Sequence, residues 1–407
     1  MRMGSATMVF VPRLRTSEDL RVHNETRLLR AIHDGQATAT RSLLTRELGM
    51  ARGTASVLVA ELIDARLLAE TPAPTASRGR PTRIPGPHPH GPIALTVDLR
   101  EDGWELAAGE LGGVTETLAT AGHSGSPQRV FAELANTLRH EVELSGGRVV
   151  GVGMSVAGPV RDGRLVHVPH LAWDATDVSE LLADVGVPVL LGNDATLAAL
   201  AEARRGALRG IGTGIHLYVD FDVGGSLVVD GRPLGGATGI AGEFGHMRLT
   251  GGTAPCMCGA RGCWGLEIGA NTLLRALGEQ AGYGRGRAQA ERLLEQAITG
   301  RSPQAAQALR ANASALGAGL GALVNANDPE LITLSGFGVA IHDFAPELVR
   351  QSYLEALMTF HRDAPPAIVA TRLGRRGPIL GAMELVFDEF LTPDAVRAWI
   401  DAHRGDG

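Results

Sequence analysis

Strand-like and helix-like segments alternate along most of this chain, and this alternation constrains its fold more than any other feature. Five segments of strand length occur in order, IALTVDL, VVGVGMSV, VPVLLG, GIHLYVDFD and ELITLSG. Helical spacing of apolar residues marks residues 127–144, 194–206, 303–325, 345–359 and 378–390. The pattern is typical of an α/β fold with mixed sheets. No repeat of fixed period is visible, which argues against propellers and helical arrays.

Length and composition predict a cytoplasmic protein of more than one domain. The chain has 407 residues, 44% of them apolar, which is enough for several packed cores without disulfides. It has three cysteines, an odd number, and does not open with a charged and apolar leader. No apolar run is long enough to cross a bilayer, so we expect no membrane contact.

Charge is unevenly distributed along the chain. Residues 1–90 contain 13 arginines and 8 acidic residues, whereas the whole chain has a net charge of −6, so a basic N-terminal part precedes an acidic remainder. Lysine is absent. The asymmetry fits either chance variation in composition or a nucleic-acid-binding module.

The basic N-terminal part shows the spacing of a helix-turn-helix. A first helix, within NETRLLRAIHDG, has Asn24 as its expected N-cap and ends at Asp34–Gly35. A short helix then meets Gly49, and a second helix follows a turn of three or four residues. The residues expected to be buried by this second helix are Val57, Leu58, Leu62 and Leu67. A small helical bundle can show the same pattern.

Candidate DNA contacts lie on the second helix and after it. Arg52, Thr54 and Ser56 stand near the N-terminus of the helix, where a recognition helix reaches base edges, although Arg52 can equally contact phosphate. The following stretch, TPAPTASRGRPTRIPGP, is rich in proline and carries Arg78 and Arg80. It suits a basic wing that enters a minor groove, a solvated linker, or both.

These patterns divide the chain into four parts. We expect a flexible tail at 1–20, a winged helix-turn-helix DNA-binding domain at 21–70, a wing and linker at 71–92, and a separate body at 93–407.

All three cysteines lie in one loop of the body, together with a histidine. His246, Cys256, Cys258 and Cys263 follow the order His-x9-Cys-x-Cys-x4-Cys and can supply the four ligands of a closed, tetrahedral zinc site within residues 246–263. A catalytic zinc needs an open position for water, so four protein ligands favour a structural zinc, one per chain. Unligated thiols and a zinc-sensing site are the alternatives.

Five segments of the body resemble, in order, landmarks of the ROK family (repressors, open reading frames and sugar kinases): GVGMSVAGPV, PHLAW, GNDATLAALAE, GIAGEFGH and CMCGARGCW. The resemblance covers nearly the whole chain, and the N-terminal part is similar to that of the repressor branch. It implies that residues 93–407 form a sugar-binding body with a two-lobed, actin- or hexokinase-like (RNase H-like) fold. It also implies the same zinc ligands.

The resemblance also implies a set of sugar-binding residues. Carboxylates and amides on loops at strand ends suit the hydroxyls of a sugar. By resemblance, Asn193, Asp194, Glu243 and His246 would bind sugar hydroxyls, with one nitrogen of His246 on the metal and the other on the sugar. For Asn193 and Asp194 a helix cap is the competing interpretation. The family's glutamate after the Cys-Trp pair is replaced here by Gly265, and Glu267 two residues later is the candidate substitute.

Three glycine-rich loops of the kinase branch are eroded in this chain. Kinases hold ATP phosphates on backbone N–H groups of such loops, with the residue at Asp194 as general base. The first loop, Asp-x-Gly-Gly-Thr in kinases, reads DLRED at 98–102, the second reads DFDVGG at 220–225, and the third reads SGFG. We therefore expect no catalytic residue and no enzymatic activity, with Asp194 a vestigial base.

The sequence predicts a sugar-responsive transcriptional regulator, most simply a repressor of carbohydrate uptake or metabolism genes. A sugar or sugar phosphate would release it from double-stranded operator DNA, which it would bind as a homodimer or homotetramer. An active ATP-dependent sugar kinase, similar to glucokinase, and a zinc-responsive DNA-binding regulator are the alternatives.

Overall fold

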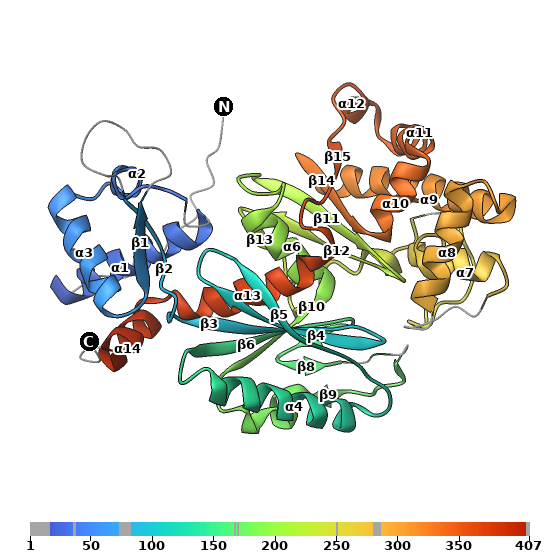
Figure 1. Ribbon diagram of the computed structural model, residues 1–407. Helices are drawn as coiled ribbons and strands as arrows, with labels where there is room; N and C mark the ends of the chain where they lie inside the picture. The colour runs from blue at the N-terminus through green and yellow to red at the C-terminus, as the bar shows by residue number, and fades with distance from the viewer. Residues whose placement is uncertain are drawn as a thin grey trace. The chain divides into compact units, whose positions relative to one another are not determined.

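The computed structural model describes residues 17–35, 38–72, 83–166, 168, 171–249, 251–279 and 286–403 (Figure 1). The chain divides into two compact units, residues 1–91 with 388–407 and residues 92–387. Helices and mixed sheets alternate along the second unit, so the α/β class predicted from the sequence is confirmed. None of the described helices is both long and apolar enough to cross a bilayer.

The N-terminal unit has the arrangement of a winged helix-turn-helix. Its elements are α1 (Ser17–Asp34), α2 (Arg41–Glu47), α3 (Arg52–Asp64), β1 (Leu68–Pro72), β2 (Arg83–Pro87) and α14 (Pro393–His403). β1 and β2 pair antiparallel, with Leu68 opposite Pro87 and Pro72 opposite Arg83, and form the wing (Figure 1). The buried side chains between the helices include Leu28, Leu29, Ile32, Leu44, Leu58 and Leu62.

The turn between α2 and α3 depends on Gly49. Its φ of 65° is in the left-handed region, which a glycine adopts without steric cost. From α1, the Arg27 guanidinium donates a hydrogen bond of 3.1 Å to the carbonyl of Leu48 and so holds the turn. Ala51, the N-cap of α3, offers no side-chain acceptor, which makes this helix start weaker than usual.

Two details of the first helices differ from the sequence prediction. α1 begins at Ser17, so residues 17–20 belong to a helix and not to a tail, and Asn24 lies inside the helix and does not cap it. Glu18 and Asp19 in the first turn favour this earlier start because they face the positive end of the helix dipole.

Val57 on α3 was predicted to be buried but is 55% exposed. Leu58 and Leu62 are buried as predicted, and Val57 lies about 100° around the helix from Leu58, outside the buried stripe. Leu67 is buried too, but it follows the end of α3 at Asp64.

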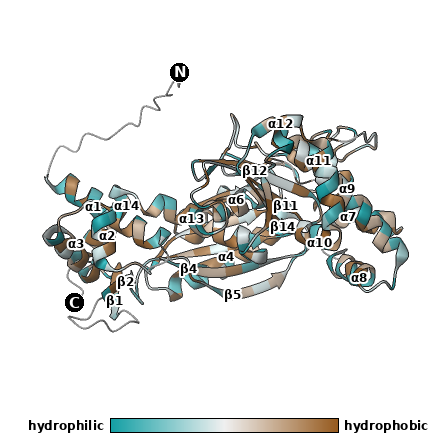
Figure 2. Cartoon of the chain, turned by 90° about the horizontal axis from the view of Figure 1, so that it is seen from above, coloured by the Kyte–Doolittle hydropathy of each residue, from teal (hydrophilic) through white to brown (hydrophobic). Residues whose placement is uncertain are grey.

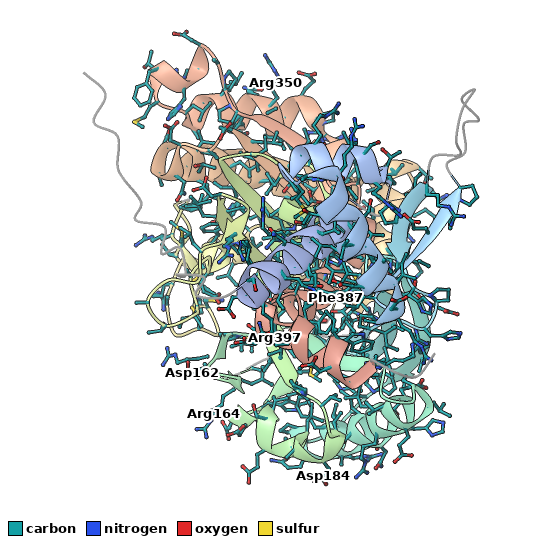
Figure 3. The ribbon with its side chains drawn as sticks, turned by 90° about the vertical axis from the view of Figure 1, so that its left-hand side faces the viewer. Asp162, Arg164, Asp184, Arg350, Phe387 and Arg397 are labelled. Atoms are coloured by element: carbon teal, nitrogen blue, oxygen red, sulfur yellow. The ribbon has the colours of Figure 1, made fainter. Side chains whose placement is uncertain are left out.

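The last residues of the chain group with the N-terminal unit and not with the body, to which the sequence assigned them. The Trp399 indole on α14 donates a hydrogen bond of 2.9 Å to the carbonyl of Ala65. Arg397, labelled in Figure 3, forms an ion pair of 3.5 Å with Asp19 on α1. These contacts explain why residues 388–407 cluster with residues 1–91.

The body has two lobes, each built on a five-stranded sheet. Lobe 1 has the strand order β10-β6-β3-β4-β5, and α4 covers one face (Figure 1). Its main elements are β3 (Ile93–Leu99), β4 (Gly103–Glu110), β5 (Thr115–Gly122), α4 (Pro127–Leu144), β6 (Val149–Val156) and β10 (Val189–Asn193). β6 and β10 run parallel to β3, whereas β4 is antiparallel to it.

Smaller elements lie between β6 and β10. They are β7 (Val160–Arg161), β8 (Arg164–Leu165), β9 (Thr176–Asp177), α5 (Val178–Leu181) and a 3₁₀ turn at Ala183–Val185. Asp162 and Arg164, at the turn between β7 and β8, lie close together at the surface in Figure 3.

Lobe 2 has the strand order β13-β12-β11-β14-β15. Its strands are β11 (Thr213–Val219), β12 (Val223–Val229), β13 (Arg232–Pro233), β14 (Leu331–Gly336) and β15 (Ala367–Ala370). Its helices are α7 (Ala270–Ala276), α8 (Gly286–Ile298), α9 (Pro303–Asn327), α10 (Phe337–Phe344), α11 (Pro346–Ala356) and α12 (Thr359–Arg362). Hydrophobic residues of β11 and β14 pack with α9 in its core (Figure 2).

Two further helices, α6 (Asp194–Arg205) and α13 (Gly377–Phe390), lie against each other. Gly381 permits this approach, because a Cβ atom there would lie 1.9 Å from the carbonyl oxygen of Leu197. α6 also contacts β11 and β12. It follows directly from β10, so this helix connects lobe 1 with the sheet of lobe 2.

The N-terminal unit contains a pair of carboxyl groups, one buried and one half-buried, that makes its stability depend on pH. Glu25 on α1 is 2% exposed and adjoins Glu61 on α3, and the Arg21 guanidinium pairs with both. Burial, and then the neighbouring Glu61, raise the pKa of Glu25 to about 7. The folded unit therefore binds more protons than the unfolded chain between about pH 4.5 and 7, and its stability falls as pH rises through that window.

We predict that Glu25→Gln removes this loss, because an amide keeps a donor for Glu61 and carries no charge. The gain in the free energy of unfolding is expected to be about 2 kcal/mol at pH 8 and to shrink toward pH 5. Urea denaturation at both pH values measures it. Glu18→Gln, on the exposed side of the same helix, is the matched control. An equal gain at pH 5 and pH 8 would contradict this explanation.

Candidate functional site

A cavity of about 160 Å³ is lined by residues from both lobes of the body. Lobe 1 contributes the carboxyl ends of β3, β6 and β10, which meet at one edge of the sheet, and lobe 2 contributes the β11–β12 turn and residues 239–246. The charged and polar side chains that line it are Asp98, Arg100, Glu101, Asn193, Asp194, Thr196, Tyr218, Asp220, Asp222, Glu243 and His246. Ligands of α/β proteins commonly bind at such strand ends.

Asn193 and Asp194 line the cavity where β10 passes into α6. The Asn193 amide oxygen caps α6 by accepting from the N–H of Thr196 at 3.1 Å. Its amide nitrogen donates to the carbonyl of Gly158 at 3.1 Å and to the Asp194 carboxylate at 3.0 Å. Asn193 is therefore a helix cap that also orients Asp194, and the role of this pair in sugar binding stays a prediction.

Burial raises the pKa of Asp194 well above its ordinary value, and the carboxylates of Glu101, Asp98 and Asp220 raise it further. Hydrogen bonds from the N–H of Ala195 and from Asn193 oppose this shift only in part. An aspartate in this environment accepts a proton or a hydrogen bond from a hydroxyl group readily.

The β3–β4 turn forms the next part of the wall. Asp98 is 4% exposed, accepts from the Ser155 hydroxyl at 3.0 Å and pairs with Arg100 at 2.9 Å. Burial raises its pKa despite these partners. Burial also raises the pKa of Glu101 to about 7, with Asp220 as a further cause.

The lobe 2 side contributes groups that sequence reasoning did not assign to a sugar site. Asp220 forms a bidentate ion pair with Arg287 on α8, at 3.1 and 2.5 Å. The Arg287 guanidinium also lies 5.0 Å from the centre of the Phe221 ring. Tyr218 lines the cavity near the end of β11. The period-two alternation of GIHLYVDFD was the available signal, since it places Tyr218 and Asp220 on one side of the strand.

Glu243 and His246 line the opposite wall, on either side of a short 3₁₀ turn. The Nε2 atom of His246 lies 3.9 Å from the Glu243 carboxylate, and both side chains are about half exposed. Burial raises the pKa of Glu243, and His246 opposes this shift. The pair thus presents an acceptor and an imidazole to a ligand.

Glu267 is not among the described residues that line the cavity, and its role as a substitute for the glutamate missing at 265 stays a prediction. Its carboxylate lies beside Gly252, where an added Cβ atom would be 2.5 Å from Oε1. Gly265 packs near the backbone of Gly245, one residue before His246. Of the five predicted sugar-binding residues, the structure brings four together.

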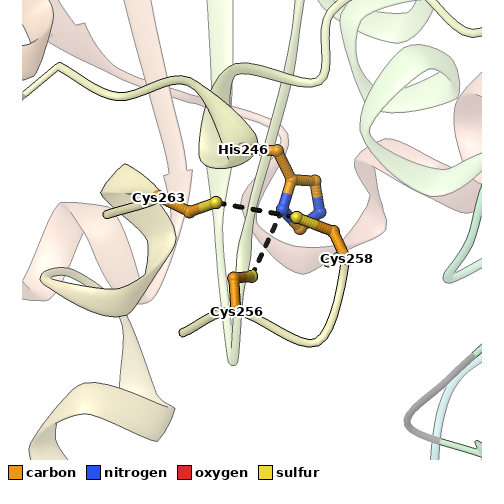
Figure 4. Close-up of side chains that lie close together, drawn as sticks. All are labelled: His246, Cys256, Cys258 and Cys263. Atoms are coloured by element: carbon orange, nitrogen blue, oxygen red, sulfur yellow. Dashed lines mark hydrogen bonds between the residues drawn. The ribbon is translucent and has the colours of Figure 1, made fainter. Parts of the chain in front are cut away.

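The four predicted metal ligands converge (Figure 4). One ligand atom of each of His246, Cys256, Cys258 and Cys263 lies within 4.8 Å of the others. The Nδ1 atom of His246 is 3.7 Å from the Cys256 sulfur, and the sulfurs of Cys258 and Cys263 are 3.6 Å apart. A tetrahedral zinc with Zn–S bonds of about 2.3 Å and a Zn–N bond of about 2.0 Å separates its ligand atoms by roughly 3.5–3.8 Å. This cluster therefore can hold a metal ion.

The candidate DNA contacts on α3 are all solvent-exposed: Arg52, Thr54 and Ser56. The Ser56 hydroxyl donates to the carbonyl of Arg52 at 3.0 Å. Arg78 and Arg80 lie outside the described residues. Arg83 is the first described residue of the second wing strand, β2, and its side chain is exposed.

The cap at α6 yields a prediction. Asn193→Ala removes the acceptor for Thr196 and both donor contacts, so we expect the free energy of unfolding to fall by about 1 kcal/mol or more. Asn193→Ser keeps a capping oxygen but loses the bond to Gly158, and should recover part of this loss. Thermal denaturation of both variants measures the two contributions. Equal stability of the alanine variant and the wild type would show that this cap does not hold α6.

The chain is similar in sequence to a sugar kinase and a repressor, and in structure to a transcriptional regulator. A glucokinase of Streptomyces coelicolor is 27% identical over 312 residues, which cover 72% of this chain and 98% of that protein. A xylose repressor of Bacillus spizizenii is 23% identical over 365 residues, which cover 86% of this chain and 92% of the repressor. The crystal structure of a ROK family transcriptional regulator, described as a homologue of the Escherichia coli MLC protein, matches with a TM-score of 0.72 and 23% identity over 94% of this chain and 99% of its own.

The match to a protein family covers most of the body. The model of the ROK family matches residues 115–389, more than half of the chain, and this segment includes the α6 start and the four metal-ligand candidates. The resemblance seen in the sequence is thereby confirmed: the chain belongs to the ROK family.

Proposed function

We propose that this protein is a sugar-responsive transcriptional regulator, most simply a repressor of carbohydrate uptake or metabolism genes that a sugar releases from operator DNA. The observation that carries the proposal is the presence, in one chain, of a winged helix-turn-helix unit and a ROK body whose cavity is lined by carboxylates. The first suits DNA binding and the second suits a ligand rich in hydroxyl groups, so together they fit a ligand-responsive regulator.

The relatives support the proposal. The similarity to a xylose repressor runs over 86% of this chain and so extends beyond the family domain. The similarity to a glucokinase covers 72% of the chain and nearly all of that enzyme. A regulator that keeps the sugar-binding body of a kinase and adds a DNA-binding unit fits both matches.

For DNA binding, α3 is the proposed recognition helix. Its exposed Arg52, Thr54 and Ser56 would meet base edges in a major groove, and the wing would meet the backbone or a minor groove. A two-fold operator with half-sites about one helical turn apart would then require two copies of the chain. We therefore propose a homodimer or homotetramer that acts in the cytoplasm.

For sugar binding, the proposed acceptors are Asp194, Glu243 and the groups around them. Asp194 and Glu243 are carboxylates on opposite walls of the cavity, so a sugar would bridge the two lobes by hydrogen bonds from its hydroxyl groups. Asn193 acts mainly by orienting Asp194, because its side chain is already engaged with Thr196, Gly158 and Asp194.

For the metal cluster we propose one structural zinc per chain. Four protein ligands would complete its coordination, which leaves no position for a catalytic water. With the metal on Nδ1, the imidazole of His246 would be fixed with Nε2 toward Glu243 and the cavity. A sugar that contacts Nε2 would then be linked mechanically to the metal loop.

Elemental analysis of the purified protein should find about one zinc per chain. Cys258→Ser should lose the metal, loosen the loop that carries His246 and weaken the response to sugar. Met257→Ser changes the exposed residue next to Cys258 without removing a ligand and is the matched control. Wild-type protein free of zinc, purified without chelators, would overturn this assignment.

The regulator proposal is tested by measuring DNA binding and the response to sugar separately. An operator is first selected from random duplex DNA with the wild-type chain, and sugars are then screened for release. Glu243→Ala should bind this operator at wild-type strength but no longer be released, because it lacks a sugar contact. Arg52→Ala should lose about tenfold or more in preference for the operator over random DNA and keep its sugar affinity.

Gel shifts and calorimetry report these two properties independently. The proposal fails if wild-type protein selects no sequence from random DNA, or if no sugar alters its DNA binding. The route through Glu243 fails if Glu243→Ala still binds the sugar normally or is still released by it. A ligand shifts the equilibrium only if it prefers the released state, so affinity and release must change together.

An active sugar kinase is the second candidate, favoured by Asp194 in the cavity and by the glucokinase relative. The loops that would hold the ATP phosphates argue against kinase activity. Asp220 of the second loop is bound by Arg287, and the first loop presents Arg100 and Glu101 where kinases have glycines. Phosphoryl transfer from ATP to a hexose by the wild-type protein would reverse this choice.

A zinc-responsive regulator is the remaining alternative. Release of the operator by zinc alone, without sugar, would favour it.

A further inference from the structure

Carboxylates dominate the described lining of the cavity in the body. Among the described residues, six carboxylate side chains line it, Asp98, Glu101, Asp194, Asp220, Asp222 and Glu243. Arg100 is the one arginine in this described lining, and it is bound by Asp98 at 2.9 Å. The nearby Arg287 is bound by both oxygens of Asp220. A ligand that enters therefore meets negative or hydrogen-bond-accepting groups from both lobes.

The carboxylates already repel one another. The neighbouring Glu101, Asp98 and Asp220 raise the pKa of Asp194 beyond the effect of burial, and Asp220 does the same for Glu101. An added dianion would increase this repulsion, since like charges at close range in a partly buried cavity interact strongly. Neutral hydroxyl groups, in contrast, donate hydrogen bonds to such carboxylates.

Backbone N–H groups do not offer a phosphate site at the β11–β12 turn either. Gly224 and Gly225 lie within β12, opposite Tyr218 and Leu217 of β11 in a regular antiparallel ladder. A Cβ atom on Gly225 would lie 2.8 Å from the Phe244 ring. Gly225 is thus explained by packing, and this stretch is part of the sheet and not an open anion-binding loop.

We propose that the effector of this protein is a sugar without a phosphate group, and that the cavity rejects sugar phosphates by charge. This inference rests on the proposed function and narrows it, because the ROK body by itself leaves both classes of effector open. It assigns Glu101 and Asp222 a role in specificity. Glu101 lies on the β3–β4 turn and the exposed Asp222 on the β11–β12 turn, so the two flank the cavity from opposite lobes.

The test uses matched pairs of ligands on the full-length, zinc-loaded protein. Calorimetry compares glucose with glucose 6-phosphate, N-acetylglucosamine with its 6-phosphate, and xylose with xylose 5-phosphate. In each pair that binds, we expect the free sugar to bind about tenfold or more tightly, and the difference to shrink at high salt as the carboxylates are screened. Operator release should follow the same order.

Variants that remove a single charge identify which carboxylates discriminate against the phosphate group. Glu101→Gln and Asp222→Asn should each narrow the difference between a free sugar and its phosphate, mainly by improving the binding of the phosphate. Asp230→Asn is the matched control, because Asp230 is exposed, lies outside the cavity lining and has a φ of 50° that asparagine tolerates. Unchanged discrimination in both variants would show that these carboxylates do not exclude phosphate.

The outcomes separate this inference from the proposed function. If sugar phosphates bind more tightly than free sugars and release the operator, the protein is a sugar-responsive regulator and the inference is wrong. If no member of any pair binds or affects DNA binding, the proposed function and the inference both fail. Free sugars that bind and release the operator, with phosphates that do neither, support both.

Discussion

The cap that Asn193 places on α6 is the interaction on which the rest of the site depends. Three hydrogen bonds of one amide side chain fix the start of the helix, the loop at Gly158 and the orientation of Asp194. α6 then packs against β12, where Gly224 leaves room for Ala195 because a Cβ atom would approach it to 2.6 Å. The position of Asp194 relative to both lobes thus follows from one helix start.

Charge decides what the cavity can bind. Asp98 and Asp220 are each held by an arginine, which offsets part of the cost of placing their charges away from water. Asp194 and Glu101 have no such direct ion pair among the contacts described above, and their pKa values are raised. A ligand rich in hydroxyl donors satisfies such groups, whereas an anion does not. Under our proposal, the residues that replace the kinase's phosphate loops would also set the preference for a sugar without phosphate.

In the proposed function, the two units have different roles. In the N-terminal unit, α3 carries the exposed residues proposed to contact DNA, while Glu61 on the same helix adjoins the buried Glu25 of α1. In the body, His246 belongs both to the metal-ligand cluster and to the cavity wall. In the proposed regulator, release would connect ligand binding near the metal loop with DNA binding on the α3 surface.

Much of this protein follows from its sequence alone. Apolar periodicity located the main strands and helices, because burial of one face imposes a period of two or 3.6 residues on the chain. The spacing of His246, Cys256, Cys258 and Cys263 predicted a ligand cluster, since all four lie within a single loop. Strands β4, β5 and β12 were not predicted, as their glycines, threonines and alanines carry a weak apolar pattern.

Only the tertiary structure decided which distant residues share the site. Glu267 closely follows the metal loop but is not among the described residues that line the cavity, whereas Glu101, from the other lobe, lines it together with Tyr218 and Asp220. Val57 could be placed on the exposed side of α3 only once its neighbours were known. The physical reason is common to these cases: local periodicity fixes which elements form, but the packing of one element on another fixes which side chains face each other.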